Sequence, residues 1–338
     1  MPKLVFAVGG TGGHIIPAKI LRKELKQYEI TFAGIGLKPI EGVQTVTLTG
    51  ANFSLKKPFS SLLKMAKGVY QSIKLLKKEK PKAVIGFGSY HSFPPLLAAY
   101  ILRIPYILYE PNRKAGRVNR LFASKALFTA LLFESIQDEL KCPFKTIAPL
   151  IPIEKHEKGR ARIELGLDED KLTLLVFGGS QGAQSINEAM MRLAKELPSS
   201  LQVYHVCGSQ NDPSSILETY LDCNVKAVVV AYEKRMDLCW SAADFAICRS
   251  GANSVMEQIE YSCPAIFIPY PHDRDGHQKA NAHYAKTKVG GSLIIEAERL
   301  TIKEVLSLIE SKETMQRNMD EYKLSRKAEN FHTLIMGI

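Results

Sequence analysis

The sequence predicts an α/β protein with two Rossmann-like parallel-sheet domains and a cleft between them. Apolar strand-like runs alternate with helical patterns along nearly the whole chain, and this alternation is typical of parallel sheets covered by helices. The series of an apolar strand, a glycine-rich turn and a helix also occurs at two places in the chain, around GGTGGH (9–14) and GGSQGAQSIN (178–187). Ligands of such sheets bind at the carboxyl ends of the strands.

Length and composition agree with a soluble, two-domain protein. The chain has 338 residues, of which 46% are hydrophobic and 23% charged, and this length allows about two domains with separate cores. Its six cysteines form no CxxC pair, so we expect reduced thiols in a cytosolic protein. The N-terminal residues lack the pattern of a secretory signal peptide.

The elements of the first half follow from short, mostly apolar strand runs that are separated by longer amphipathic segments. We expect strands at 3–8, 30–34, 43–48, 83–87, 104–109, 126–129 and 145–148. We expect helices at 15–27, 60–79, 93–103, 115–123 and 134–140. The next segment, 149–167, is charged, contains proline and is weakly periodic, so we place the domain junction there and assign 1–152 to the first domain.

The second half repeats the same cycle, and we assign 153–310 to the second domain. We expect strands at 172–177, 202–206, 225–230, 244–247, 265–268 and 292–294. We expect helices at 182–196, 213–221, 234–241, 252–260, 277–287 and 301–310. The last segment, 311–338, is charged and helical, and it could pack back onto the first domain.

Positive charge is concentrated in the first half of the chain. Residues 1–152 hold 23 Lys+Arg and 8 Asp+Glu, whereas the chain as a whole has a formal net charge of +11. Segment 56–82 holds nine lysines and one glutamate, and its apolar residues recur at helical spacing. This pattern predicts either a helix that contacts an anionic membrane surface or a core-packed helix with solvated lysines. Nucleic acid is disfavoured as a partner, because aromatic residues are not interleaved with the lysines.

The first glycine turn, GGTGGH, predicts a phosphate-binding loop. Glycines let backbone N–H groups approach an anion, and the following helix adds its positive dipole end. A dinucleotide fingerprint would place an acidic residue about 20 positions further on, and the expected second strand, ITFAGIG, ends without one. An NAD-dependent dehydrogenase is therefore disfavoured. The second turn, with Ser180 and Gln181, could bind a diphosphate in the same way, although either turn alone could be a plain tight connection.

The stretch 248–282 predicts a nucleotide-sugar site. RSGANS forms a third glycine turn, and Glu257 lies one helical turn further on, where its carboxylate could accept from both hydroxyls of a ribose. Gln278 and Asn281 lie one turn apart and offer donors and acceptors to a sugar. Taken alone, a glutamate such as Glu257 is more often a solvated helix residue, and only the combination of these residues is specific. No metal-ligand pattern accompanies these residues, and we expect neither a metal nor another cofactor.

Six motifs in this order resemble the MurG family, the bacterial transferases that make lipid II from lipid I and UDP-N-acetylglucosamine. The motifs are GGTGGHIIPA, GFGSYHSFPPLLAA, YEPNRKAGRVNR, GGSQGAQSIN, CRSGANSVMEQ and DGHQKANA. The resemblance covers nearly the whole chain. It implies the GT-B fold, an inverting transfer to the 4-hydroxyl of the N-acetylmuramoyl sugar of lipid I, and a peripheral position on the cytoplasmic face of the bacterial membrane, through 56–82.

The resemblance also implies roles for individual residues of the first domain. His14 matches a histidine proposed to act in catalysis, and we consider Glu110 the alternative base. Asn112 matches an asparagine that contacts the donor sugar. The sugar and diphosphate would lie near Thr11, Gly12 and Gly13, and Tyr90 would line the acceptor side.

In the second domain the implied donor site is more extensive. Ser180 matches a serine that contacts the diphosphate, and Gln278 matches a glutamine that reads the sugar hydroxyls. Asn281 follows one turn later. The nucleotide-binding segment corresponds to Ala252, Asn253, Ser254, Val255, Met256 and Glu257, with Glu257 on the ribose.

Three positions depart from the family pattern. Pro152 stands where the family has an arginine that contacts the donor, and we expect Arg249 to be a possible replacement for that charge. Tyr109 replaces a histidine, and the loop 86–92 is poorer in glycine than is usual. Two alternatives stay open: a GT-B enzyme that glycosylates diacylglycerol, and a non-catalytic protein that binds UDP-sugars.

Overall fold

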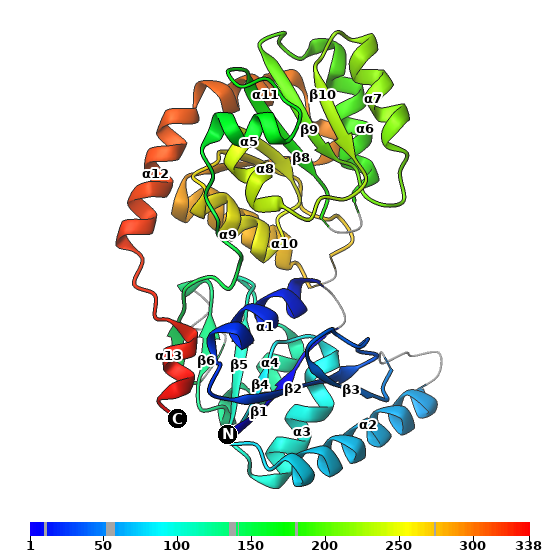
Figure 1. Cartoon of the computed structure of the whole chain (residues 1–338), viewed down its shortest axis with the longest axis vertical. Coiled ribbons are helices and arrows are strands. Elements are labelled where there is room, and N and C mark those ends of the chain that lie inside the picture. Colours follow the sequence, from blue (N-terminus) through cyan, green and yellow to red (C-terminus); the bar gives the residue numbers. More distant parts are fainter. Residues whose placement is uncertain (10–11, 52–57, 135–139, 141, 180–181, 274) are drawn as a thin grey trace. The chain divides into compact units, whose positions relative to one another are not determined.

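The computed structural model describes the chain except for residues 10–11, 52–57, 135–139, 141, 180–181 and 274. The chain forms two compact units (Figure 1). Unit 1 comprises Met1–Ile151 and Lys327–Ile338, and unit 2 comprises Pro152–Arg326. The division falls within one residue of the expected junction. The C-terminal segment 311–338 is shared, because its first part belongs to unit 2 and only its last twelve residues belong to unit 1.

Unit 1 is built on a seven-stranded parallel sheet with the strand order β3-β2-β1-β4-β5-β6-β7. The order reverses at β1, so β1 and β4 lie side by side, with Phe6 opposite Ile85. Their carboxyl ends are the point at which doubly wound sheets bind ligands. The strands are β1 (Lys3–Ala7), β2 (Glu29–Ile35), β3 (Gln44–Leu48), β4 (Ala83–Gly86), β5 (Tyr106–Glu110), β6 (Thr129–Leu131) and β7 (Phe144–Thr146).

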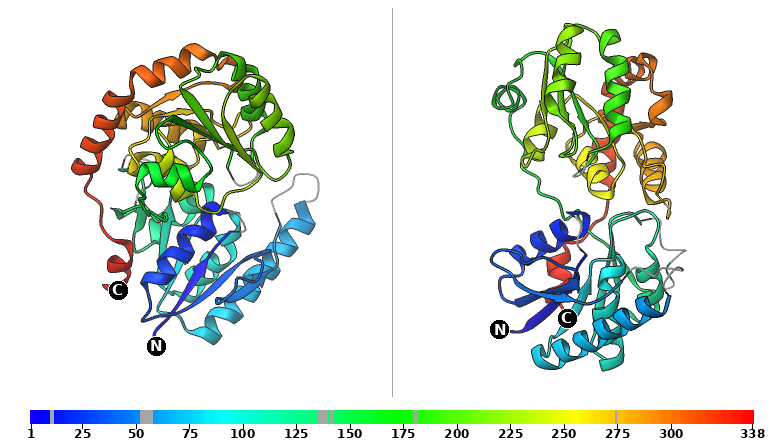
Figure 2. Two further views of the ribbon diagram at one scale, coloured as in Figure 1. Left: turned by 45° about the horizontal axis from the view of Figure 1, so that its top comes forward. Right: turned by 90° about the vertical axis from the view of Figure 1, so that its right-hand side faces the viewer.

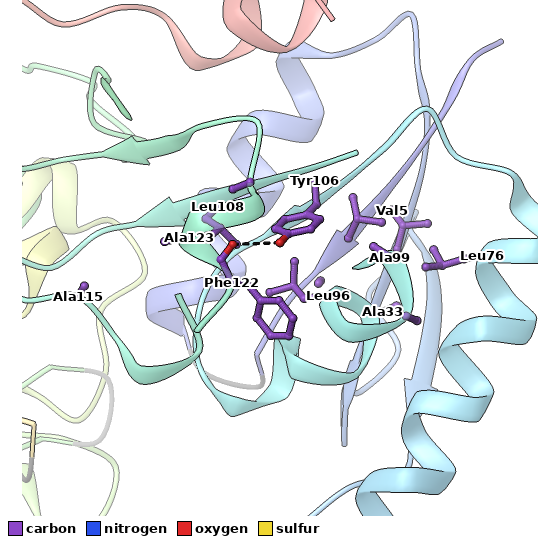
Figure 3. Packing of buried hydrophobic residues seen from close by; sticks show 14 of the residues in the cluster. Val5, Ala33, Leu76, Leu96, Ala99, Tyr106, Leu108, Ala115, Phe122 and Ala123 are labelled. Carbon is purple, nitrogen blue, oxygen red and sulfur yellow. Dashed lines mark hydrogen bonds between the residues drawn. The ribbon is translucent and has the colours of Figure 1, made fainter. Parts of the chain in front are cut away.

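Helices cover both faces of this sheet, and α2 lies beside α3 (Figures 1 and 2). The helices are α1 (Gly12–Glu24), α2 (Pro58–Glu79), η1 (Tyr90–Ser92), α3 (Phe93–Leu102), α4 (Arg117–Phe122), η2 (Ala123–Lys125) and α13 (Phe331–Met336). Pro94 and Pro95 occupy the first turn of α3, where a missing N–H costs little. The core beneath α3 and α4 packs Leu96 and Phe122 against the sheet, and the Tyr106 hydroxyl donates to the Phe122 carbonyl at 3.0 Å (Figure 3).

The last residues of the chain complete unit 1. The Phe331 ring of α13 stacks on Tyr109, with ring centroids 6.2 Å apart, and meets Phe128 edge to face. Glu329 pairs with Ile147 at the margin of the sheet, and His332 lies 3.1 Å from the Glu24 carboxylate of α1. Tyr109, which replaces the family histidine, is therefore a buried core residue that holds the C-terminal helix.

Unit 2 is built on a six-stranded parallel sheet with the strand order β10-β9-β8-β11-β12-β13. The strands are β8 (Leu172–Phe177), β9 (Leu201–Val206), β10 (Ala227–Val230), β11 (Phe245–Cys248), β12 (Ala265–Phe267) and β13 (Ser292–Ile294). The helices are α5 (Lys158–Glu164), α6 (Gln184–Leu193), η4 (Ala194–Glu196), α7 (Pro213–Asp222), α8 (Met236–Ala242), α9 (Ala252–Glu260), α10 (His277–Tyr284), η5 (Ala285–Val289), η6 (Ala297–Arg299), α11 (Ile302–Glu310) and α12 (Lys312–Ser325). The prediction of two parallel-sheet α/β domains is confirmed.

Three elements differ from the predictions. The expected strand 126–129 begins only at Thr129, because Ala123–Lys125 forms a 3-10 turn first. The expected helix 134–140 falls largely outside the described residues. Helix α5 was not expected within 149–167; the Glu157 carboxylate caps its first turn by accepting from the amides of Gly159 and Arg160.

Buried Asp244 joins α5, the sheet and α12 within unit 2. It accepts from Arg162 at 2.6 Å, from Lys158 at 3.0 Å and from Lys312 at 2.8 Å, and the Thr173 amide donates to it at 2.9 Å. Burial by itself raises the pKa of Asp244, but these hydrogen bonds and the two lysine charges outweigh burial and hold the pKa below its ordinary value. The ionised carboxylate therefore stabilises the folded unit at neutral pH.

Replacement of this carboxylate should destabilise unit 2. We expect Asp244→Asn to lower the free energy of unfolding by about 3 kcal/mol, because three cationic side chains lose the anion that they share. Urea unfolding at pH 7 measures the change. Asp168→Asn is the matched control: Asp168 pairs with Lys226 at the surface, and exposed ion pairs contribute little. Equal effects of the two substitutions would contradict the assignment.

Candidate active site

Two loops of unit 1 come together around Gly9, after β1 and β4. A Cβ atom placed on Gly9 would lie 3.2 Å from His14 Cδ2, 3.3 Å from His91 Nδ1 and 3.5 Å from Ser89 Cβ. Helix α4 joins them at Gly88, where a Cβ would lie 3.6 Å from Asn119 Nδ2. Gly88 also has a positive φ of 83°, which favours glycine. Glycine at position 9 thus permits a close approach of the backbone to His14 and His91, and glycine at position 88 permits the positive φ.

The structure fixes the orientation of His14. Its Nδ1 lies 2.7 Å from the Phe87 carbonyl oxygen. A carbonyl only accepts, so Nδ1 carries the proton and donates it, and Nε2 of the neutral ring carries the lone pair. This tautomer is the one that a general base needs if Nε2 takes the proton from a substrate.

Glu110 has a different role in the same region. Its side chain is buried, and its oxygens accept from the Asn112 amide at 3.0 Å, the Gly116 amide at 2.8 Å and Asn119 Nδ2 at 2.9 Å. The Asn112 side chain donates to it as well, at 3.3 Å. The carboxylate thus shapes the loop after β5, and this geometry favours His14 over Glu110 as the base.

The loop after β4 contains two polar residues that the sequence analysis did not single out. Ser89 Oγ lies 2.8 Å from His91 Nδ1, and the His91 ring packs on Tyr90 with ring centroids 3.8 Å apart. Burial lowers the pKa of His91, so its ring is neutral at pH 7. A second histidine directly after Tyr90 was the available signal, but only the fold places it near His14.

Gly12 and Gly13 form the first turn of α1, directly before His14. A Cβ on Gly13 would meet no atom within 4 Å, and one on Gly12 would meet only the Ile16 side chain at 3.7 Å. These two glycines therefore leave open space at the start of the helix. Thr11 lies outside the described residues, so its expected contact stays a prediction.

The second glycine turn follows β8 in unit 2. Gly182 has φ +78°, and a Cβ there would lie 2.4 Å from the Cys207 carbonyl oxygen. A Cβ on Gly178 would lie 2.2 Å from the Ala183 amide. The turn is thus tightly folded against its neighbours before α6 begins. Ser180 lies outside the described residues.

The predicted nucleotide-binding segment forms the first turns of α9, after β11. Val255 and Met256 are buried in the core, and Ala252 is also buried at the first position of the helix. Asn253 and Ser254 stay partly accessible. The segment therefore contributes its backbone and its polar side chains to a surface, while its apolar side chains hold the helix in place.

Glu257 is partly buried on α9. Its Oε2 accepts from the Trp240 indole N–H at 3.0 Å. Burial raises the pKa of Glu257 to about 7, and the Trp240 hydrogen bond acts in the opposite direction. At neutral pH this carboxyl group is thus close to its titration midpoint, which is typical of functional sites.

Arg249 connects three segments of unit 2. Its Nη1 donates to the carbonyls of Ile268 and Pro269 at 2.9 and 3.2 Å, and its Nη2 donates to Ser185 Oγ at 3.0 Å. Burial lowers the pKa of this guanidinium. Arg249 therefore positions the turn before α9 against α6 and the loop after β12, and these contacts engage both of its terminal nitrogens.

Gln278 and Asn281 on α10 are joined to the same turn. The Gln278 side-chain oxygen accepts from the Tyr270 amide at 3.0 Å, and the Gln278 backbone carbonyl accepts from Ser250 Oγ at 2.9 Å. Asn281 is buried and donates to the Ser250 carbonyl at 3.2 Å. Asn281 thus has a positioning role, and Gln278, which is only partly buried, is better placed to meet a ligand.

One group of potential metal ligands occurs among the described residues. Single ligand atoms of Glu154, His156 and Asp237 lie within 4.8 Å of one another. His156 Nε2 lies 2.9 Å from the Asp237 carboxylate, and its amide donates to Ser241 Oγ. These contacts attach the beginning of unit 2 to α8, and none of the three residues belongs to the glycine turns.

Comparisons with known proteins identify the two units. The N-terminal domain of glycosyltransferase family 28 matches residues 4–130, and its C-terminal domain matches residues 173–336. A relative from Protochlamydia amoebophila is 40% identical over 91% of this chain and 86% of its own length. A relative from Halothermothrix orenii is 35% identical over 91% and 89%. Both are named UDP-N-acetylglucosamine–N-acetylmuramyl-(pentapeptide) pyrophosphoryl-undecaprenol N-acetylglucosamine transferase.

A solved structure gives the same result. The crystal structure of Acinetobacter baumannii MurG has a TM-score of 0.75 and 25% sequence identity, and the match covers 99% of this chain and 98% of that one. The resemblance that the six motifs indicated is thereby confirmed. The chain is a glycosyltransferase that belongs to glycosyltransferase family 28 and, within it, to the MurG group.

Proposed function

We propose that this chain transfers N-acetylglucosamine from UDP-N-acetylglucosamine to the 4-hydroxyl of the N-acetylmuramoyl sugar in lipid I, which forms lipid II. Its relatives are named for this transfer. The observation that carries the proposal is the hydrogen bond between His14 and the Phe87 carbonyl. It orients a histidine base within the glycine loops of unit 1, the unit that we assign to the acceptor.

His14 acts as the general base in this mechanism. Its Nε2 takes the proton of the acceptor hydroxyl as the oxygen attacks the anomeric carbon of the donor. The new carbon–oxygen bond forms on the face opposite the leaving group, so the anomeric configuration inverts. UDP departs with the electron pair of the broken bond.

Unit 2 binds the donor in our proposal. The first turns of α6 and α9 lack a side-chain cap, so their amides are suited to stabilise the charge that develops on the diphosphate. Glu257 accepts from the ribose hydroxyls, and Gln278 contacts the sugar. Arg249 and Asn281 hold these elements in position, and Pro152 leaves the charge contact of the family arginine unfilled.

Helix α2 is the proposed membrane contact. Phe59 and Leu63 are 74% and 58% exposed, and the lysines at 64, 67, 74, 77 and 78 are exposed on the same helix. Exposed apolar residues among lysines suit the surface of an anionic leaflet. In the described part of the chain, no helix is both long and apolar enough to cross a bilayer. We place the enzyme on the cytoplasmic side, where lipid I carries its sugar.

The direct test is incubation with UDP-N-acetylglucosamine and a lipid I analogue, followed by mass spectrometry of the lipid product. We expect one added N-acetylhexosamine. Parallel reactions with UDP-glucose or UDP-galactose and diacylglycerol should give no product. Transfer to diacylglycerol alone would replace the proposed acceptor, and UDP-N-acetylglucosamine binding without any transfer would refute catalysis.

Removal of the base should affect turnover and leave donor binding intact. We expect His14→Ala to lower kcat by about 10²–10⁴-fold, the range typical of a positioned general base. Calorimetric titration with UDP should give an unchanged Kd. Glu110→Gln is the comparison: because Glu110 shapes a loop, its loss should also disturb folding stability. Full turnover in His14→Ala would assign the base elsewhere.

Donor binding should depend on pH through Glu257. The ionised carboxylate can accept from two ribose hydroxyls, whereas the protonated form accepts less well. UDP-N-acetylglucosamine, whose diphosphate has no group that titrates near pH 7, should therefore bind more weakly as the pH falls below about 7. Titration calorimetry from pH 5.5 to 8.5 measures this. Trp240→Phe removes a hydrogen bond that lowers the pKa of Glu257, so the transition should move to higher pH. Glu257→Gln should abolish the pH dependence, and its persistence there would exclude Glu257.

The lysines of α2 should control vesicle binding. Reversal of Lys74, Lys77 and Lys78 to glutamate should release the protein from vesicles rich in phosphatidylglycerol, since each lysine near an anionic surface contributes about 1 kcal/mol. Sedimentation with vesicles measures the bound fraction. Reversal of Lys195, Lys286 and Lys288 in unit 2 is the charge-matched control. Equal release by both triple variants would mean that net charge, and not α2, determines binding.

A further inference from the structure

Helix α2 packs on unit 1 through small residues. Ser61 in its first turn and Gly68 and Ser72 near its middle are buried. A Cβ on Gly68 would lie 2.1 Å from the Thr49 carbonyl oxygen, and Ser72 Oγ donates to the Gly68 carbonyl at 2.8 Å. The middle of the helix therefore approaches the end of β3 very closely through small residues, whereas Leu76, nearer its C-terminal end, is buried in the core of unit 1.

Those larger side chains form one wall of an apolar groove. The groove has a volume of about 710 Å³, and α2 contributes Leu62, Met65, Ala66, Val69, Tyr70 and Ile73 to it. Phe93 and Leu97 of α3 and Val118 of α4 line the groove as well. Its volume lies within the range of small-molecule sites, about 300–1,000 Å³. Leu62 and Tyr70 are more than half exposed, so the groove opens to the surface of α2.

The groove also reaches the catalytic loops. Tyr90 lines it, and Tyr90 packs on His91, which together with His14 surrounds Gly9. Among the described residues that line the groove, Arg117 at the start of α4 is the one charged side chain. A ligand in this groove would thus have an apolar part along α2 and an anionic part near Arg117 and the loop after β4.

We propose that the groove binds the first isoprene units of a polyprenyl pyrophosphate, with the pyrophosphate near Arg117. This inference rests on the proposed function, and it assigns the lipid part of the acceptor to a defined site. The relatives named above act on a pyrophosphoryl-undecaprenol, a ligand with this distribution of apolar chain and charge. A bilayer surface cannot enter a concave groove, whereas a single chain that leaves the bilayer can.

The residues that line the groove differ from the residues of α2 that we assign to the membrane contact. Phe59 and Leu63 are exposed on α2 but do not line the groove. Ala66 lines the groove and is exposed enough to accept a larger side chain. Substitutions at Ala66 and Leu63 therefore separate binding of a chain in the groove from contact with a bilayer.

The first experiment measures binding of geranylgeranyl pyrophosphate to the full-length protein without membranes, by displacement of a fluorescent prenyl pyrophosphate. We expect Ala66→Trp to weaken binding about tenfold or more, because the indole fills space that would otherwise bury several methylene groups. The matched control Leu63→Trp should bind as the wild type does. If the two variants bind equally well, the groove is not the site. Leu62→Ser, which removes part of the apolar wall at an exposed position, should weaken binding in the same direction.

The second experiment tests the anionic end. Arg117→Gln should weaken the binding of geranylgeranyl pyrophosphate several-fold. Arg120 is an exposed arginine of the same helix that does not line the groove, so Arg120→Gln should leave this binding unchanged. Inorganic pyrophosphate alone should compete poorly in all variants. Tight competition by inorganic pyrophosphate would reveal a simple anion site and overturn the proposal.

Transfer assays separate failure of this inference from failure of the proposed function. With a lipid I analogue that carries geranylgeranyl, Ala66→Trp should raise KM and keep kcat; with a methyl group in place of the chain, it should match the wild type. Equal KM changes for both acceptors would overturn the groove and leave the transfer reaction intact. The protein could also bind prenyl pyrophosphate, lose this binding in Ala66→Trp and show no transferase activity. That result would support the groove as a lipid site and refute the proposed function.

Discussion

The hydrogen bond between His14 and the Phe87 carbonyl depends on the pairing of β1 with β4. Parallel pairing places the carboxyl ends of these strands side by side, and the Phe87 amide extends the ladder by donating to the Ala7 carbonyl at 2.9 Å. The loop after β4 therefore begins directly beside the loop that carries His14. Glycine at position 9 provides the space for this approach, and glycine at position 88 adopts the positive φ of the loop after β4. The sheet thus determines the tautomer of the histidine through one backbone carbonyl.

In unit 2, a side chain instead of a backbone carbonyl joins the segments that surround the candidate site. Arg249 attaches the turn before α9 to α6 and to the loop after β12, and Asn281 attaches α10 to the same turn. These contacts hold α9, which carries Glu257, and α10, which carries Gln278, against the same turn. Burial disfavours the charged form of Glu257 and raises the pKa of its carboxyl group to about 7. A pKa near 7 makes the charge of this carboxyl group sensitive to pH in the neutral range.

The sequence predicted the strands with small errors because each one is a short apolar run bounded by turn residues. It singled out His14, Glu257 and Gln278 because they follow glycine turns at the ends of such strands, and their roles stay predictions. It could not decide whether Glu110 shapes a loop or acts as a base, since both roles require a carboxylate after β5. It did not single out His91 or the groove beside α2, because both arise from contacts between segments that are distant in the chain.

The sequence alone determined the alternation of strands and helices, the two glycine turns and the family to which the chain belongs, since each depends on local patterns. Only the tertiary structure decided that Tyr109 holds the C-terminal helix, that α12 belongs to unit 2 while α13 belongs to unit 1, and that α2 packs closely at Gly68 while Leu62 and Tyr70 stay more than half exposed. These outcomes depend on side-chain volume and on partners far along the chain, which a linear pattern does not contain.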